Sequence, residues 1–182
     1  MPSDRQTPTD FSMLSTERLT LRPHSIEDLD HVFELAHDPA VHEFIRGLPT
    51  SREEAWHRLL RYAGHWSLLG YGMFAVFERA SGTFIGEVGL ADFRRGLGPD
   101  FDGNPEAAWL FAGASHGKGY ALEAMAALLG WFGQEHASAR TVCIIDVANA
   151  ASTKLAGRLG FQQYGTAVYR EAHVAKYERS GS

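Results

Sequence analysis

The chain has 182 residues, of which 45% are hydrophobic and 21% charged, and its formal net charge is -5. A chain of this length and ordinary globular composition can form a hydrophobic core without disulfide bonds or bound metals, so we expect one compact domain. The acidic balance gives no general attraction to nucleic acid or anionic membranes. The single cysteine, Cys143, excludes an intrachain disulfide and a cysteine-rich zinc site.

The beginning of the chain has no pattern typical of secretion. Residues 1–15 are polar and predict a flexible leader, whereas residues 16–180 predict the folded domain. The leader lacks a basic start followed by an apolar run, and no stretch reaches the ~18 apolar residues of a membrane helix. Together with the lone cysteine, these features predict a cytoplasmic protein with no membrane or nucleic-acid partner.

In chain order, the first half of the sequence predicts a strand, two helices and two strands. Polar and apolar residues alternate over 17–22, as expected of a half-buried strand. Ser25 offers an N-cap for a helix that we expect to end at Pro39, and Ser51 with Glu54 begins a second helix. The two strands are separated by a short linker that suits a hairpin, and they cover residues 72–78 and 83–90.

The second half of the sequence is organised around a glycine-rich turn. A loop over 94–105 precedes it, and the expected elements are a buried strand at 107–112, the turn at 117–121, a helix at 122–132, a strand at 141–147, a short helix at 151–159 and strands at 162–169 and 173–179. A turn between a strand and a helix is informative because amides at a helix start are unpaired and lie at the positive end of the helix dipole. Glycines there let a diphosphate approach, so the turn predicts an anion cradle, with a ligand-free tight turn as the alternative.

The turn itself excludes two common nucleotide-binding motifs. Lys118 is followed by Gly119 rather than Ser or Thr, so the Walker pattern is absent, and Leu122 breaks the dinucleotide fingerprint. His116-Gly117-Lys118-Gly119-Tyr120-Ala121 instead resembles the Gln/Arg-x-x-Gly-x-Gly/Ala turn of the Gcn5-related N-acetyltransferase (GNAT) superfamily, with His in place of the first residue.

The resemblance extends over about residues 15–177 and is closest to the branch of ribosomal-protein N-terminal acetyltransferases (RimJ/RimL-like). Its further marks are Thr16-Glu17-Arg18-Leu19, Leu21-Arg22-Pro23, Gly86, Asn149-x-x-Ser152 and Leu159-Gly160-Phe161. The resemblance implies a single-domain α/β GNAT fold, with a mixed, mostly antiparallel sheet of about seven strands flanked by about four helices.

By the same resemblance, we expect an acyltransferase that moves the acetyl group of acetyl-CoA to a primary amine by direct attack on the thioester. The acceptor would be a protein N-terminus or a small-molecule amine, and a homodimer is a further expectation by analogy. The reaction needs no metal, and the histidines form no His-Glu-x-x-His pair. Two alternatives stay open: a non-catalytic acyl-CoA-binding module, and transfer from another donor such as succinyl-CoA.

The resemblance also assigns the residues that would bind the coenzyme. The backbone of Phe111, Ala112 and Gly113 would bind the pantetheine arm, and the turn from His116 through Gly117, Lys118, Gly119 and Tyr120 to Ala121 would bind the diphosphate. Asn149 and Ser152 would lie beside the pantetheine and the thioester. Their structural alternative is an N-cap followed by a polar residue in the first helical turn.

The expected chemistry needs a base for the amine and an acid for the leaving thiolate. By alignment with the family, Glu106 is the candidate base, with a solvated carboxylate at a strand end as the alternative. Many relatives have a tyrosine acid where Ala156 stands, so Ser152 is the first substitute and Tyr164 a more distant one. Ser152 alternatively serves only in packing or capping.

Relatives form the acceptor site from segments that correspond here to residues 38–48, 66–73 and 94–104. Three aromatic residues in or beside these segments could wall a pocket or belong to the core: Phe44, Trp66 and Tyr71. Asp100, Asp102 and Glu106 would favour a cationic amine.

Overall fold

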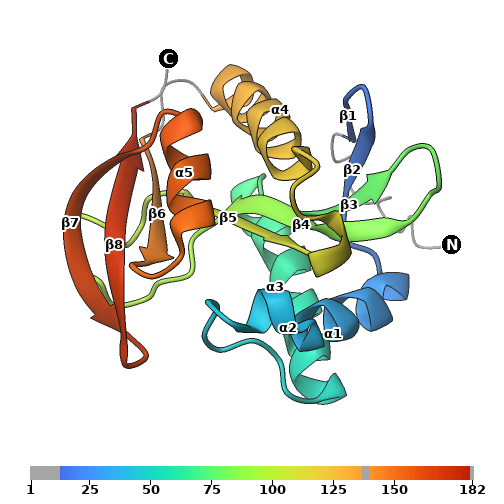
Figure 1. Cartoon of the computed structure of the whole chain (residues 1–182), viewed down its shortest axis with the longest axis horizontal. Coiled ribbons are helices and arrows are strands. Elements are labelled where there is room, and N and C mark those ends of the chain that lie inside the picture. Colours follow the sequence, from blue (N-terminus) through green and yellow to red (C-terminus); the bar gives the residue numbers. More distant parts are fainter. Residues whose placement is uncertain (1–12, 137–139, 181–182) are drawn as a thin grey trace, which may run out of the picture.

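The structure is a computed structural model, and it describes residues 13–136 and 140–180 (Figure 1). Within these residues eight strands form one sheet in the order β1-β2-β3-β4-β5-β6-β8-β7. Their bounds are β1 Leu14–Ser15, β2 Leu19–Pro23, β3 Met73–Glu78, β4 Phe84–Ala91, β5 Glu106–Phe111, β6 Thr141–Asp146, β7 Gln162–Tyr169 and β8 Ala172–Arg179. All neighbouring strands are antiparallel except β5 and β6, which confirms the predicted mixed, mostly antiparallel sheet.

Five α-helices accompany the sheet in the described residues: α1 Leu29–His37, α2 Pro39–His42, α3 Arg52–Leu69, α4 Tyr120–Glu135 and α5 Ala150–Arg158. Short 3-10 turns span Ile26–Asp28 and Gly113–Ser115. The sequence predicted Pro39 as a helix end, but Pro39 also begins α2, because Asp38 accepts a hydrogen bond from the amide of Ala40 and proline fits the first helical position. None of the described helices has the length and apolar character to cross a lipid bilayer.

The end of the segment predicted as a leader takes part in the sheet. Leu14 and Ser15 pair with Leu21 and Thr20 of β2, whereas residues 1–12 of that segment lie outside the described part of the chain.

The main core lies between the sheet and α4 and confirms the hydrophobic periodicity of the sequence. Met125, Leu128 and Phe132 of α4 pack against strand residues that include Cys143, which is only 1% exposed. Burial raises the pKa of the Cys143 thiol, as expected of a core cysteine. On β4, a Cβ at Gly86 would lie 2.3 Å from the carbonyl oxygen of Leu110, so only glycine permits the close approach of β4 and β5.

β5 and β6 separate soon after they meet. Within the described residues their parallel register joins only Glu106 to Val142, and the amide of Val142 donates to the carbonyl of Pro105 at 3.0 Å. Beyond this point β5 continues beside β4, while β6 continues beside β8 (Figure 1). The sheet is therefore open between β5 and β6.

Candidate functional site

A cavity of about 230 Å³ occupies the opening between β5 and β6. Its lining includes Glu106–Leu110 of β5, Ile144–Asp146 of β6, Asn149 and Ser152 of α5, Arg58 and Arg61 of α3, Phe44–Gly47 of the loop after α2, and Tyr169 and Arg170 at the turn between β7 and β8. A second cavity shares Gly47, Arg58, Arg61 and Arg170 with the first. The sheet opening, α3 and two loops thus surround one continuous cleft.

The glycine turn precedes α4, as the sequence predicted. Gly117 and Gly119 have φ angles of 75° and 80°, and Gly119 is the N-cap of α4. The first backbone hydrogen bond of this helix runs from Glu123 to Gly119. Among the described residues, the amides from Gly117 to Leu122 have no acceptor, and residues 116–119 are exposed. The turn therefore presents exposed N–H groups at the positive end of a helix, an arrangement that fits a diphosphate.

The segment before β2 holds this turn in place. The guanidinium of Arg18 donates to the carbonyl of Lys118 at 2.9 Å and to a carboxylate oxygen of Glu123 at 2.7 Å. The hydroxyl of Thr16 donates to the same carboxylate at 2.5 Å. These bonds give a physical reason for the family motif Thr16-Glu17-Arg18-Leu19, because the side chains of Thr16 and Arg18 hold the first turn of α4.

The end of β5 uses several of its backbone groups within the protein. The amide of Ala112 donates to the carbonyl of Ile85 at 3.0 Å, and the amide of Gly113 donates to Asp38 at 2.8 Å. His116 Nε2 lies 2.7 Å from the carbonyl oxygen of Phe111 and donates to it in the tautomer protonated at that nitrogen.

Alternation along β5 identifies the groups that face the opening. Successive residues of a strand direct their backbone N–H and C=O groups to opposite sides. Because the amide of Ala112 bonds to β4, the backbone groups of Trp109 and Phe111 point the other way, toward β6. The N–H groups of Trp109 and Phe111 therefore face the cavity side of β5. The backbone of Ala112 and Gly113 was also predicted to contact the coenzyme, and the amides of both residues already have acceptors within the chain.

Asn149 and Ser152 begin α5 and also line the cleft. Asn149 Oδ1 accepts a hydrogen bond from the amide of Ser152 at 3.0 Å, so the capping interpretation holds for Asn149. Ser152 Oγ accepts a hydrogen bond from Trp109 Nε1 at 3.1 Å. Because an indole can only donate, the hydroxyl hydrogen of Ser152 remains available for another acceptor.

Glu106 lies at the start of β5 and is only 3% exposed, so it is not a solvated carboxylate. Both of its carboxylate oxygens lie 2.8 Å from Nε of Arg95. Burial raises the pKa of Glu106, and the charge of Arg95 and its hydrogen bond act in the opposite direction. The candidate base is therefore a buried carboxylate that faces the cleft beside a fixed cation.

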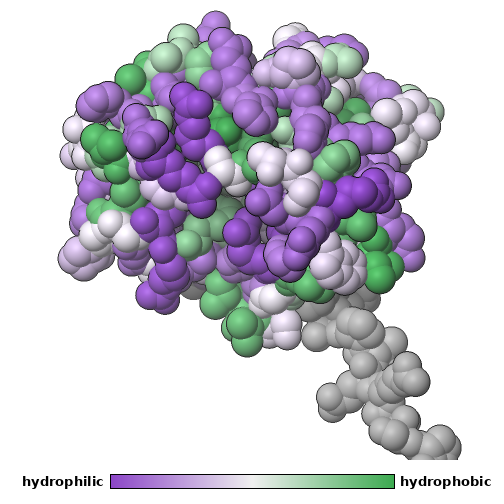
Figure 2. Space-filling model, turned by 90° about the horizontal axis from the view of Figure 1, so that it is seen from below, coloured by the Kyte–Doolittle hydropathy of each residue, from purple (hydrophilic) through white to green (hydrophobic). Residues whose placement is uncertain are grey.

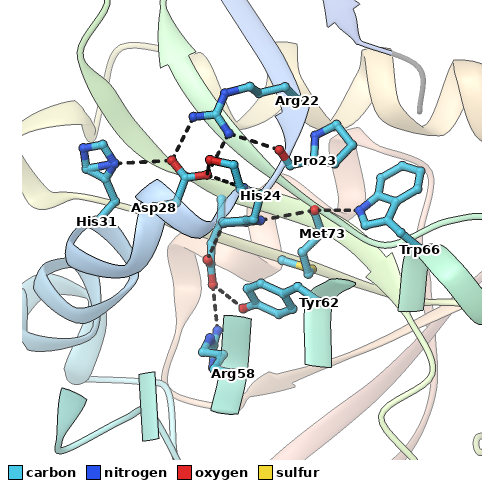
Figure 3. Close-up of polar contacts among 11 residues, drawn as sticks. Arg22, Pro23, His24, Asp28, His31, Arg58, Tyr62, Trp66 and Met73 are labelled. Carbon is cyan, nitrogen blue, oxygen red and sulfur yellow. Dashed lines mark hydrogen bonds and ion pairs between the residues drawn. The ribbon is translucent and has the colours of Figure 1, made fainter. Parts of the chain in front are cut away.

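A second buried carboxylate, Glu87 of β4, supports the α3 wall of the cleft. Its Oε1 accepts hydrogen bonds from Arg58 at 2.7 Å and from the hydroxyl of Tyr62 at 2.6 Å, and His24 Nε2 lies 3.3 Å from Oε2. Arg58 and Tyr62 point from α3 toward one carboxylate (Figure 3). Although burial alone would raise the pKa of Glu87, Arg58 and the other partners lower it well below its usual range. Sequence reasoning missed this group, although one charged residue inside the apolar strand Phe84–Ala91 was a detectable signal.

The structure places the three aromatic residues of the predicted acceptor region in different surroundings. Phe44 lines the cleft, but Trp66 lies in the core with its indole bonded to the carbonyl of Met73, and Tyr71 packs against the same core. Asp100 forms an ion pair with Lys176 at 2.6 Å, and Asp102 accepts from the amide of Gly98.

Neither of these aspartates lines the cleft, whereas Glu106, the third acidic residue predicted for the acceptor side, does. The described lining also contains five arginines: Arg46, Arg58, Arg61, Arg95 and Arg170. Tyr164, the remote candidate acid, also lies outside the lining and has Arg140 and Lys176 near its ring. No group of three or more metal-ligating side chains occurs within residues 13–136 and 140–180.

The family model of the acetyltransferase (GNAT) domain matches residues 18–162. A protein of Bordetella pertussis, assigned to the GnaT acetyltransferase family, is 36% identical and superposes with a TM-score of 0.86, with 92% of this chain and 99% of that chain covered. An acetyltransferase from Agrobacterium tumefaciens is 26% identical, with a TM-score of 0.77 and coverage of 92% and 93%. A ribosomal L7/L12 α-N-protein acetyltransferase, solved with coenzyme A, is 16% identical, with a TM-score of 0.76 and coverage of 93% and 98%, and so shares the fold.

Proposed function

Because the chain belongs to the acetyltransferase (GNAT) domain family, we propose that it transfers the acetyl group of acetyl-CoA to a primary amine. The observation that carries the proposal is the run of amides without acceptors from Gly117 to Leu122, which begins with the exposed residues Gly117–Gly119 and leads into α4. It fits a diphosphate, and it follows β5, the strand at the edge of a sheet opening whose wall holds a buried carboxylate, Glu106.

In this proposal the coenzyme crosses the opening of the sheet. The amides from Gly117 to Ala121 bind its diphosphate, while His116 stabilises the strand end through the carbonyl of Phe111. The inward-facing N–H groups of Trp109 and Phe111 bind the pantetheine arm in the manner of a neighbouring strand. When bound, acetyl-CoA supplies the activated acyl group, and no metal is required.

Glu106 acts as the base that removes a proton from the acceptor ammonium, directly or through one water. A carboxylate has about four lone-pair positions, so the pair of contacts with Arg95 leaves positions for the incoming proton. Burial raises the pKa of Glu106 and makes it a stronger base, whereas the charge and the hydrogen bond of Arg95 act to lower that pKa.

Ser152 acts as the hydrogen-bond donor and acid for the leaving thiolate. Trp109 is a positioning residue, because its indole N–H occupies an acceptor site of Ser152 Oγ and leaves the hydroxyl hydrogen free to point elsewhere. This role replaces that of the tyrosine found in many relatives, which this chain lacks at Ala156.

Succinyl-CoA is a second candidate donor, because arginines line the cleft and could bind an acyl carboxylate. A donor panel separates the two candidates: succinyl transfer at a rate above acetyl transfer would reject the acetyl assignment.

The proposal is tested by titrating the purified protein with CoA, acetyl-CoA and pantetheine in a calorimeter. We expect CoA to bind at least about tenfold more tightly than pantetheine, which lacks the diphosphate that the turn would hold. Thiol release in the presence of an amine panel then tests transfer. Absence of CoA binding at millimolar concentration would refute the proposal, and tight binding without turnover would support a non-catalytic acyl-CoA-binding module.

A further inference from the structure

The acceptor side of the cleft is strongly cationic although the chain as a whole is acidic. Of the five arginines in the described lining, Arg58 pairs with Glu87 and Arg95 pairs with Glu106. The other three, Arg46, Arg61 and Arg170, have no ion pair with a carboxylate within the described residues. A chain with a net charge of -5 thus places unneutralised cations around one cavity.

These cations lie away from the coenzyme side of the cleft. Arg61 and Arg170 also line the second cavity, whose described lining contains no residue of β5, β6 or α5. Figure 2 views the molecule from the side of α1, α2 and the β7–β8 turn in Figure 1, and this face is mostly hydrophilic. The position favours contact with the acceptor rather than with the acyl group near Ser152.

Aromatic rings orient several of the guanidinium groups. Arg61 and Arg95 lie over the ring of Phe93, with distances of 5.8 and 4.7 Å from Cζ to the ring centroid. Arg95 also lies 4.8 Å from the centroid of Tyr169, and Arg170 lies 5.5 Å from it. Stacking of this kind restricts the guanidinium planes before a ligand arrives, which reduces the entropy lost on binding.

The backbone at Arg170 adds an independent observation. Arg170 and Glu171 connect β7 to β8 with φ angles of 48° and 66°, although glycine and asparagine are the residues that prefer this region. The side chain of Arg170 extends over Gly47, where an added Cβ would lie 1.7 Å from Nη1. A strained two-residue turn thus holds an unpaired cation across the mouth of the cleft, and strain of this kind is frequent at functional sites.

We infer that the amine acceptor carries a carboxylate, which Arg61 and Arg170 bind while its amine faces Glu106. The inference rests on the proposed function, because it names the acceptor class of the same site. A polyamine would meet uncompensated like charges, whereas a carboxylate meets planar donors suited to bidentate bonds. Burial lowers the pKa of Arg61, Tyr62 and Glu87 raise it, and the charges of Arg58 and Arg95 lower it further, which agrees with the surplus of cations here.

An assay with matched amines tests the inference. One arm compares β-alanine with β-alaninamide, and a second compares the peptide amides Ser-Glu and Ser-Gln, so that the two arms separate a free amino acid from a peptide N-terminus. In at least one pair we expect kcat/KM to be about tenfold higher for the carboxylate-bearing member. Equal values in both pairs, or a preference for spermidine, would overturn the inference.

Variants connect this preference to the two arginines. We expect Arg61→Gln and Arg170→Gln each to raise KM for the acidic amine by about tenfold and to leave KM for acetyl-CoA unchanged. Arg52→Gln is the matched control, because Arg52 is an exposed arginine of the same helix that lies outside the described lining. A loss of selectivity in the control equal to that in the variants would also overturn the inference.

A measurement without turnover separates this inference from the proposed function. In thermal-shift titrations, glutarate should stabilise the wild-type protein more than 1,5-diaminopentane does, and the double variant Arg61→Gln/Arg170→Gln should lose the difference. A glutarate effect without CoA binding would support the anion site and reject the acetyltransferase assignment. The reverse result, CoA binding with no difference between glutarate and the diamine, would reject the anion site alone.

Discussion

The two carboxylate oxygens of Glu106 share one donor, Nε of Arg95, which lies 2.8 Å from each of them. Both side chains line the cleft, and the side chain of Glu106 is 4% exposed. Removing one partner of a buried pair leaves an uncompensated charge, so the two residues act as a unit. Two of the predictions below separate their roles.

Glu106→Gln should lower kcat by about 10²- to 10⁴-fold, because the amide keeps the shape of the side chain and cannot accept the proton. The affinity for acetyl-CoA should stay within about twofold, since this group faces the acceptor. Steady-state kinetics and calorimetry measure the two quantities. Wild-type turnover in the variant would remove Glu106 from the mechanism.

Arg95→Gln should move the acidic limb of the pH profile of kcat/KM to higher pH. Arg95 lowers the pKa of Glu106 against the effect of burial, so its loss raises that pKa further. The base works only when deprotonated, and the limb should therefore shift upward by about one pH unit or more. Arg94→Gln, a change at the exposed neighbour that pairs with Asp92, should leave the limb in place. An unshifted limb for Arg95→Gln would show that another group controls it.

Glu87→Gln should reduce the free energy of unfolding at pH 7 by about 3–5 kcal/mol, because it leaves Arg58 buried without its carboxylate. The pKa of Glu87 is lowered in the folded state, so its contribution is present above the unfolded pKa of about 4.3 and is lost as the pH falls below it. Urea denaturation of both proteins from pH 7 to pH 3 should therefore show a shrinking difference. A constant difference would contradict the ionised state assigned to Glu87.

Trp109→Phe should lower kcat about fivefold, the effect of losing one hydrogen bond to Ser152 Oγ. A double-mutant cycle with Ser152→Ala separates positioning from packing. If Trp109 acts through Ser152, the double variant should be no slower than Ser152→Ala alone. Fully additive effects would assign Trp109 a separate role.

Glu171→Gly should raise the free energy of unfolding by about 0.5–1 kcal/mol, because glycine adopts a positive φ without steric cost. Arg170 remains in this variant, so selectivity for acidic amines should persist. Chemical denaturation measures the stability. A destabilised variant would show that the side chain of Glu171 makes a contribution larger than the relieved strain.

Local patterns were enough to predict most of the fold and the turn before α4. Alternation predicted β2, capping residues predicted the start of α3, and the glycines at 117 and 119 marked the N-terminus of α4 because positive φ angles favour glycine. Pro39 was predicted only as the end of a helix, although proline also fits the first position of a helix, and Asp38 caps the helix α2 that begins there.

The chemistry of the acceptor side could not be predicted from local patterns. From the sequence, Asp100 was a candidate to attract a cationic amine, but in the structure it is paired with Lys176, 76 residues away. The arginines of the cleft come from two loops, a helix and a hairpin turn that only the tertiary structure brings together. Glu106 was identified by alignment with the family, but its ion-pair partner Arg95 lies in a loop whose path the sequence did not indicate.

Within the described residues, the two parts of the sheet, β1–β5 and β6–β8, are paired only between Glu106 and Val142. In the proposed function, the coenzyme would lie between these two parts and bind the free backbone N–H groups of β5. We therefore expect bound coenzyme to slow the opening of the sheet at this point and to protect the folded chain against heat and proteolysis.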